Sequence, residues 1–196
     1  MTAFSPELVT DILLRLPVIS LLRFRCLSAS VCTEIDSAYF VKNHLNRSIQ
    51  SKTGQKLIIR NSDSNDFFPA NFVDDLQVTA PLNNPPSVSP LHFTVVCDSC
   101  NGLILLRMIV LVENDTFFNF AIWNPFTRQY KKLPLHPVQT LPAGYKTITG
   151  YGLGYDSTLD DYKFVMITEV SHVSFQVWIF SLKSNSWRKS QDLLFF

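Results

Sequence analysis

The sequence lacks an excess of charge of either sign and any long apolar run. Its 17 Lys and Arg residues nearly balance its 16 Asp and Glu residues, which leaves a formal net charge of +1. A chain so close to neutral has no overall field to draw in nucleic acid or an anionic membrane. Its longest apolar stretches, such as 108–112 and 164–167, fall far short of the roughly 20 residues that cross a bilayer. We therefore expect neither a nucleic-acid-binding protein nor a membrane-spanning one.

Cysteine is scarce, and the chain begins without a signal for export. Charged residues interrupt residues 1–17, which lack the basic, apolar and small-residue zones of a signal peptide. Reduced thiols in the cytoplasm or nucleus are therefore expected. Cys97 and Cys100 form a CxxC pair, but Cys26 and Cys32 lie six residues apart in a helical region and do not supply the second ligand pair of a zinc site. We expect no bound metal and no cofactor.

Motifs for catalysis, phosphate binding and calcium binding are also missing. The four histidines are scattered, and no Ser or Cys lies in a GxSxG or comparable context. The Gly-rich stretch 150–154 lacks the GxxxxGK[ST] ending of a phosphate-binding loop. Asp156, Asp160 and Asp161 miss the spacing of a calcium loop, and Asp at such positions serves turns. We expect a strand and a turn here, in a chain that is not an enzyme.

The first 48 residues have the apolar spacing of helices. Leu8, Ile12 and Leu16 recur at four-residue intervals, which gives a helix one apolar stripe. Ser5 can cap that helix, and Pro17 ends it. Three further short helices are predicted over 21–24, 27–35 and 39–45, the last of them capped by Ser37.

This helical segment carries more leucine than it can bury. A chain of about 40 residues seldom folds around one core without a metal, disulfides or a partner. Leu8, Leu13, Leu16, Leu21 and Leu22 exceed the capacity of so small a bundle. Either another chain or the C-terminal half of this one covers the excess, and size alone does not decide between them.

Past residue 50 the sequence has the alternation and the turn formers of strands. The predicted strands are 56–60, 93–97, 102–108, 118–123, 130–133, 151–155, 162–168, 175–181 and 186–189. The stretch 62–90 is rich in Asn, Asp, Pro and Ser, so loops are expected there, with at most short strands near Phe72 and Leu76.

Two segments share one hairpin pattern. Trp123 and Tyr130 lie seven residues apart around a polar turn, as do Phe180 and Trp187, and two basic residues follow each pair. The copies are 57 residues apart, slightly above the roughly 50-residue period of kelch-type propeller blades. The pattern favours propeller blades, while hairpins with aromatic ends also occur in other antiparallel sheets.

The motifs of both halves resemble one known family. The stretch FSPELVTDILLRLPVISLLRFRCLS, followed by EIDSAYFVKNHLNRS, resembles the F-box of plant F-box proteins of the F-box-associated or S-locus F-box-like type. The motifs SCNGL, WNPFTR, GLGYDS, DDYK and SLKSNSWR are similar to that family's associated domain. The resemblance implies an α+β multidomain fold: a helical F-box at 1–48, a strand and loop connection at 49–92, and an all-β, antiparallel, partial propeller at 93–196.

The resemblance implies a substrate-recruiting adaptor of an SCF-type ubiquitin ligase. Its F-box would bind a Skp-type adaptor held by a cullin scaffold, and its β domain would bind an unknown target protein, while other subunits transfer ubiquitin. The positions implied to contact the adaptor are Pro6, Leu8, Ile12, Leu13, Leu16, Pro17, Val18, Leu21, Leu22, Phe24, Cys26 and Leu27.

Two departures from the family pattern qualify that role. Ala29, Ser30 and Val31 stand where the family usually has a Lys, a gap and a Trp, and losing such a side chain at a hot spot costs about 2 to 4 kcal/mol. The family's associated domain also continues for roughly another hundred residues or more, since a propeller needs four to eight blades, so we expect a truncated product or a fragment. The alternative function is a ligase-independent or decayed protein-interaction module, with a role in self-incompatibility as a further possibility.

Overall fold

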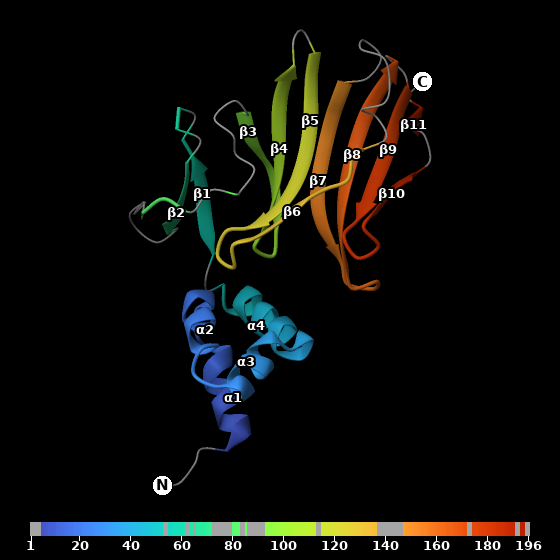
Figure 1. Ribbon diagram of the computed structural model, residues 1–196. Coiled ribbons are helices and arrows are strands. Elements are labelled where there is room, and N and C mark those ends of the chain that lie inside the picture. Colours follow the sequence, from blue (N-terminus) through green and yellow to red (C-terminus); the bar gives the residue numbers. More distant parts are fainter. Residues whose placement is uncertain are drawn as a thin grey trace. The chain divides into compact units, whose positions relative to one another are not determined.

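Figure 1 shows the computed structural model of the chain. It describes residues 5–52, 55–61, 63–64, 66–71, 80–82, 85, 93–112, 115–136, 147–171, 174–190 and 193–194. The chain divides into two compact units, one of residues 1–59 and 67–82 and the other of residues 60–66 and 83–196.

Four helices open the first unit. They are α1 (Pro6–Leu14), α2 (Val18–Phe24), α3 (Ala29–Asp36) and α4 (Ala38–Ser51). Ser5, Ser28 and Ser37 cap α1, α3 and α4, because each side chain accepts a hydrogen bond from the backbone N–H three residues ahead. The predicted cap at Ser5 and the break at Pro17 are confirmed. Leu27, predicted inside the third helix, lies in the turn before it.

A small apolar core joins these helices. Each helix contributes one buried residue to it, and these are Leu13, Leu21, Ile35 and Phe40. Two side-chain contacts link α3 and α4 to α1 and the turn after it. The Thr10 hydroxyl of α1 donates to Glu34 of α3 at 3.2 Å, and the His44 Nε2 atom of α4 lies 2.8 Å from the Leu16 carbonyl oxygen. Partly buried apolar residues pack around the four buried ones, and these are Val9, Leu14, Leu16, Phe24 and Val31.

Two short strands, β1 (Lys56–Arg60) and β2 (Phe67–Asn71), form a sheet of their own. The first coincides with a predicted strand, and the second ends at Asn71, directly before Phe72, near which a short strand was expected. Pro69 is tolerated in it because both strands of a two-stranded sheet are edge strands. Phe67 and Ala70 have no exposed surface. The short strand expected near Leu76 lies outside the described residues.

The second unit contains two antiparallel sheets, side by side in Figure 1. One is built in sequence order from β3 (Phe93–Cys100), β4 (Leu103–Val112), β5 (Asp115–Asn124) and β6 (Gln129–Lys132). The other consists of β7 (Thr147–Asp156), β8 (Asp161–Ser171), β9 (Ser174–Ser181) and β10 (Ser186–Lys189), and β11 (Leu193–Leu194) also pairs with β9. A four-stranded antiparallel meander is the unit of a propeller blade, and all nine predicted strands coincide with strands of the structure.

Tight turns join successive strands at one end of these sheets. Because neighbouring strands are antiparallel, the turns after β3, β5, β7 and β9 all lie at the same end, the lower one in Figure 1. Asn101 and Gly102 connect β3 to β4 with φ angles of 52° and 81°. Positive φ at both positions is typical of the type I′ turn, whose twist matches that of the strands that it joins.

The other three turns share one four-residue design. The residue before each turn accepts side-chain hydrogen bonds from backbone N–H groups two or three residues ahead, and these residues are Asn124, Asp156 and Ser181. The last turn residue is left-handed in each, and these residues are Arg128, Asp160 and Asn185. The two predicted hairpins are therefore confirmed, and the Asp-rich stretch is a third turn of the same kind.

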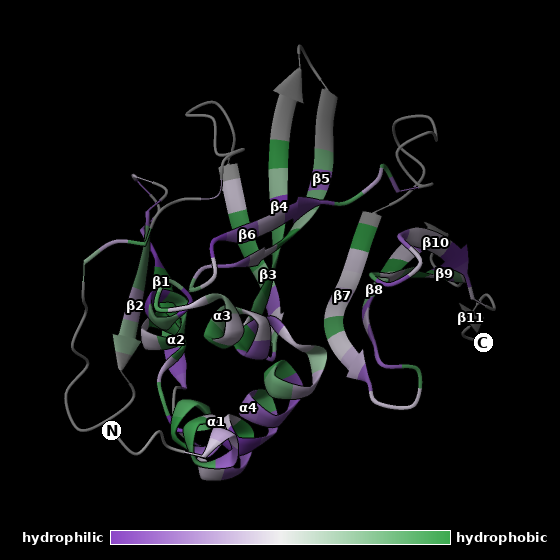
Figure 2. Cartoon of the chain, turned by 60° about the horizontal axis from the view of Figure 1, so that its bottom comes forward, coloured by the Kyte–Doolittle hydropathy of each residue, from purple (hydrophilic) through white to green (hydrophobic). Residues whose placement is uncertain are grey.

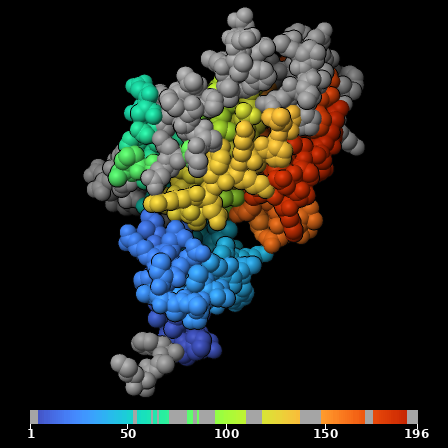
Figure 3. Space-filling view, viewed as in Figure 1, coloured from blue at the N-terminus to red at the C-terminus, as the bar shows by residue number. Residues whose placement is uncertain are grey.

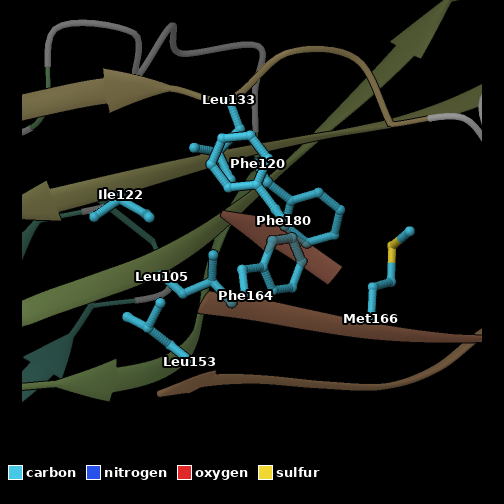
Figure 4. Packing of buried hydrophobic residues seen from close by; sticks show 8 residues of the cluster. All are labelled: Leu105, Phe120, Ile122, Leu133, Leu153, Phe164, Met166 and Phe180. Atoms are coloured by element: carbon cyan, nitrogen blue, oxygen red, sulfur yellow. The ribbon is translucent and has the colours of Figure 1, made fainter. Parts of the chain in front are cut away.

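The two sheets share one apolar core, shown in Figure 4. Phe164 links them: its ring centroid lies 4.8 Å from that of Phe120 in the first sheet and 5.2 Å from that of Trp187 in the second. Phe180 lies directly opposite Trp187, as the hairpin pattern predicts. The buried members of this core are Leu105, Phe120, Ile122, Leu133, Leu153, Phe164, Met166 and Phe180.

Two hydrogen bonds join the sheets on either side of this core, one between the inner strands β3 and β7 and one between β10 and the segment after β6. On the inner strands, the carboxylate of Asp98 lies next to a β-bulge and accepts from the Leu153 N–H at 2.7 Å. On the outer side, the Trp187 indole N–H donates to the Pro134 carbonyl at 3.2 Å. The segment after β6 is thereby fastened to β10. We call residues 133–136 the strap.

His136 ends the strap and is buried, with 3% of its surface exposed. Its ring lies edge-on to Phe120 and Trp187, with centroids 5.8 Å and 6.3 Å away. Burial lowers the pKa of His136 below its ordinary value of 6.5, because the charged ring would lose its hydration, and a hydrogen bond to the backbone of Phe118 offsets part of this effect.

This burial predicts a pH-dependent stability. As the pH falls below about 6.5, the unfolded chain binds a proton at His136 that the folded protein resists, so the free energy of unfolding decreases. His136→Leu should remove that part of the decrease. Urea unfolding of both proteins at pH values between about 7.5 and 5.5 measures it, and parallel curves for the two would contradict the prediction.

Candidate protein-docking surface

The first two helices and the following turn expose large apolar side chains. Leu8 and Ile12 on α1 are 46% and 47% exposed, Ile19 on α2 is 50% exposed, and Leu27 is 68% exposed. We call these four residues the helical surface. Exposed apolar side chains are frequent on protein interaction sites, and α4 exposes three more in Tyr39, Val41 and Ile49. Figure 2 shows hydrophobic and hydrophilic residues alternating along these helices.

The structure separates the twelve predicted contact residues into three groups. The exposed ones are Pro6, Leu8, Ile12, Pro17, Cys26 and Leu27. The half-buried ones are Leu16, Val18, Leu22 and Phe24. Leu13 and Leu21 are each only 5% exposed and belong to the helical core. These two side chains hold α1 and α2 together and do not reach a partner while the core is packed.

Ile19 is exposed but absent from the predicted contact set. It lies on α2 three positions before Leu22, the spacing that places two side chains on one side of a helix. This spacing within α2 is the signal in the sequence that indicates it.

Val31 lies in the first turn of α3, where the family pattern has Trp. It is half-buried and packs against the helical core. Its backbone N–H donates to the Ser28 hydroxyl at 3.2 Å, so the start of α3 is capped with the smaller side chain present. The substitution therefore changes side-chain volume at the edge of the core and leaves the helix start intact.

Ion pairs lie among the exposed apolar residues of these helices. Asp11 pairs with Arg15 at 2.8 Å and with Arg47 of α4 at 3.5 Å. Arg25 pairs with Asp36 at 2.6 Å, and this hydrogen bond raises the pKa of the guanidinium. Exposed pairs of this kind contribute about 0 to 1 kcal/mol each. These ion pairs place charged groups beside the exposed apolar residues, and polar groups of this kind form the rim of a protein interface.

The CxxC pair lies in a partly buried environment. Within the described ranges, no three His, Cys, Asp or Glu side chains are grouped to hold a metal ion. Burial raises the pKa of Cys97 to about 11 and also raises that of Cys100. Both thiols of the CxxC pair are therefore protonated near neutral pH, which makes them poor nucleophiles. None of the helices described has the length and apolarity needed to cross a bilayer.

Comparisons with known proteins give matches over nearly the whole chain. The family described as F-box associated beta propeller domain matches residues 47–194. F-box protein CPR1 of Arabidopsis thaliana is 32% identical over 207 residues, which cover 98% of this chain and 46% of that protein. F-box protein At4g22390 of the same plant is 33% identical, over 93% of this chain and 45% of its own length. F-box/kelch-repeat protein At3g23880, also from Arabidopsis thaliana, is 25% identical, over 95% and 52% respectively.

The chain spans about half the length of these relatives. No solved structure matches it.

The burial of the helical leucines predicts two different mutational effects. Leu13→Ala should lower the free energy of unfolding by about 2 to 5 kcal/mol, because it leaves a cavity in a core with one residue per helix. Leu8→Ala should change it by no more than about 0.5 kcal/mol. Urea unfolding followed by far-ultraviolet circular dichroism measures both. Equal losses for the two variants would show that Leu8 belongs to the core.

Proposed function

Because the chain belongs to the family with an F-box-associated β-propeller domain, we propose that it is a substrate-recruiting subunit of an SCF-type ubiquitin ligase. In this proposal residues 1–48 are the F-box, 49–92 are the connection and 93–196 are the associated domain. The F-box binds a Skp-type adaptor and, through it, a cullin scaffold. The chain performs no catalytic step, since ubiquitin transfer belongs to other subunits.

The helical surface is the observation that carries the proposal. Relatives named as F-box proteins match 93% to 98% of this chain. Leu8, Ile12, Ile19 and Leu27 supply exposed apolar side chains beside ion pairs. A few desolvated anchors of this kind provide most of the energy of an interface, and polar groups surround them. We assign these four residues, with the exposed and half-buried members of the predicted set, to the adaptor contact.

The β unit is the proposed binding site of the target protein. Its two sheets share a core with fixed inner and outer links, so their surfaces form a rigid support. Binding residues on such a support are held in place before a partner arrives, which lowers the entropic cost of association. No described residue identifies the target by itself.

One alternative function is favoured by Val31. If the missing Trp side chain is needed for adaptor binding, the chain acts as an interaction module outside a ligase. The two functions differ in adaptor affinity alone, so they can be separated by measuring it.

The proposal predicts that purified protein binds a Skp-type adaptor through α1 and α2. The double variant Leu8→Asp, Ile12→Asp should lose at least about tenfold in affinity, because charge at apolar anchors costs 1.4 kcal/mol or more. Val41→Asp is the matched control, since Val41 is an exposed apolar residue of α4 outside the predicted set. Isothermal titration calorimetry measures all three proteins.

Val31→Trp decides between the two functions. A gain of about tenfold or more in adaptor affinity would show that the native site is impaired, which favours the module outside a ligase. A folded wild-type protein that does not bind the adaptor would contradict the ligase proposal, and a thermal melt of the same sample establishes that it is folded.

A further inference from the structure

A single cation lies among the aromatic side chains between the two sheets. Arg107 of β4 pairs in register with Phe120 of β5, so its side chain leaves the first sheet on the side of the shared core. Its guanidinium carbon lies 5.3 Å from the centroid of the Phe118 ring and 5.6 Å from that of the Tyr151 ring. Phe118 belongs to the first sheet and Tyr151 to the second, so a ring from each sheet contacts the same guanidinium.

Arg107 lacks an anionic partner within the described part of the chain. It forms no ion pair with a residue described there, and its Nε atom is buried without a hydrogen-bond partner among those residues. The side chain as a whole is half-buried, so its terminal nitrogens still reach the surface. The two rings attract the positive charge through their faces but accept no conventional hydrogen bond. A guanidinium carries five N–H donors, which are therefore available to a ligand.

The acidic residue nearest in the strand pairing is engaged elsewhere. Asp98 of β3 lies opposite Leu105, two positions before Arg107. Its two carboxylate oxygens accept from the backbone N–H groups of Ser99 and Leu153, each at 2.7 Å. Asp98 is thus held in the link between the inner strands and does not neutralise the guanidinium.

The neighbouring thiol does not supply negative charge either. The Cys97 thiol interacts with the Tyr151 hydroxyl, and burial raises the pKa of Cys97 to about 11. The thiol is therefore neutral near neutral pH. The site combines one positive charge with two aromatic rings and has no counter-charge among the described residues around it.

The outer side of the space between the sheets is covered. The strap crosses this side, where His136 is buried and Leu135 is exposed, and the Trp187 indole bonds to it. Figure 3 shows this neighbourhood as adjoining surfaces, yellow for the segment around β6 and red for β9 and β10. Arg107 lies nearer the inner strands, because β4 pairs with β3 and Tyr151 belongs to β7. A partner would therefore approach Arg107 away from the strap.

Packing accounts for only part of this arrangement. The aliphatic stem of an arginine can cover apolar surface while its charged end stays in water, and lysine would serve that purpose equally. A guanidinium differs because it is planar and can offer two parallel N–H donors to the two oxygens of one carboxylate. Aromatic rings beside it exclude water, and a hydrogen bond is stronger where water is excluded. These properties favour recognition of an anion.

The number of cations indicates which anion fits. Arg107 is the only Lys or Arg residue in β3, β4, β5 and β7, the strands that surround the site. Sites for phosphate groups on proteins typically use clusters of arginine, because each phosphate carries a charge of about −2. One guanidinium matches the single charge of a carboxylate.

We propose that Arg107, held between Phe118 and Tyr151, is a binding site for an Asp or Glu side chain of the target protein. The carboxylate would accept two N–H bonds from the guanidinium, and the rings would shield this pair from water. This inference rests on the proposed function, because it names a chemical feature of the target that the β unit binds.

Nuclear magnetic resonance of the full chain tests the site directly, because the Nε–H group of an arginine gives its own signal. The probe is the peptide acetyl-Ala-Glu-Ala-amide, and acetyl-Ala-Gln-Ala-amide is the uncharged control of the same shape. We expect the Arg107 signal, identified by its absence in Arg107→Lys, to shift and saturate at millimolar Glu peptide and to stay unchanged with the Gln peptide. Arg188 is the reference within the molecule, since it is exposed and forms no ion pair with a described residue. Its signal should not saturate over the same range.

Three substitutions separate binding from packing. Arg107→Lys keeps the charge and loses the planar fork, so peptide affinity, measured from the backbone N–H signals of Phe118 and Tyr151, should fall about tenfold. Tyr151→Leu keeps the cation and removes one ring, and it should weaken binding about threefold or more. Arg188→Lys makes the matched exchange at an exposed position of β10 and should leave the affinity unchanged. A thermal melt of each variant establishes that it is folded.

The titration of the wild-type protein decides the outcome even if a variant does not fold. Absence of a saturable shift of the Arg107 signal, or an equal response of the Arg107 and Arg188 signals, would overturn the proposal. Tighter binding of the corresponding phosphoserine peptide would overturn it in favour of a phosphate group. Adaptor affinity measured on the same preparations keeps these outcomes separate from failure of the proposed function, since Arg107 lies outside the helices proposed to bind the adaptor.

Discussion

Neither sheet of the second unit can bury its aromatic face alone, and this constraint organises the rest of the unit. Phe120 comes from the first sheet and Phe164, Phe180 and Trp187 come from the second, and their rings meet in one core. Separating the sheets would expose all four. Asp98 on the inner strands and the strap on the outer side then fix how the sheets face each other. The exposed position of Leu135 and the buried position of His136 both follow from the path that the strap takes across this core.

The helical segment, by contrast, has a core too small to bury all of its apolar side chains. Its core has one fully buried residue from each helix and a few half-buried ones around them, so a limited apolar surface is removed from water within it. The capping serines contribute about 0.5 to 2 kcal/mol each and the exposed ion pairs about 0 to 1 kcal/mol. The apolar residues left outside are then available to a partner, whose binding would stabilise the helices in proportion to its concentration and affinity. Docking and stability are thus linked in this segment.

Signals that act over a few residues predicted much of this fold. Contacts between residues far apart in the sequence could not be predicted. Ser5, Pro17 and the paired aromatic residues act over a few positions, so helix starts, a helix end and two hairpins could be predicted. The bond between Asp98 and Leu153 joins residues 55 positions apart, and nothing near either residue indicates it. The contact set implied by the family resemblance includes Leu13 and Leu21, whose burial in the helical core depends on packing between helices and cannot be read from the motif.

The four tight turns at one end of the sheets limit how proteins of this design can diverge. Each turn has a fixed length, set by two positive φ angles at Asn101 and Gly102 or by a capped four-residue loop. Because turn type and loop length set the register of a hairpin, substitutions that keep the length of these turns preserve the strand pairing. Side chains can be exchanged there on a constant backbone, which gives a route to new partners that leaves the core unchanged.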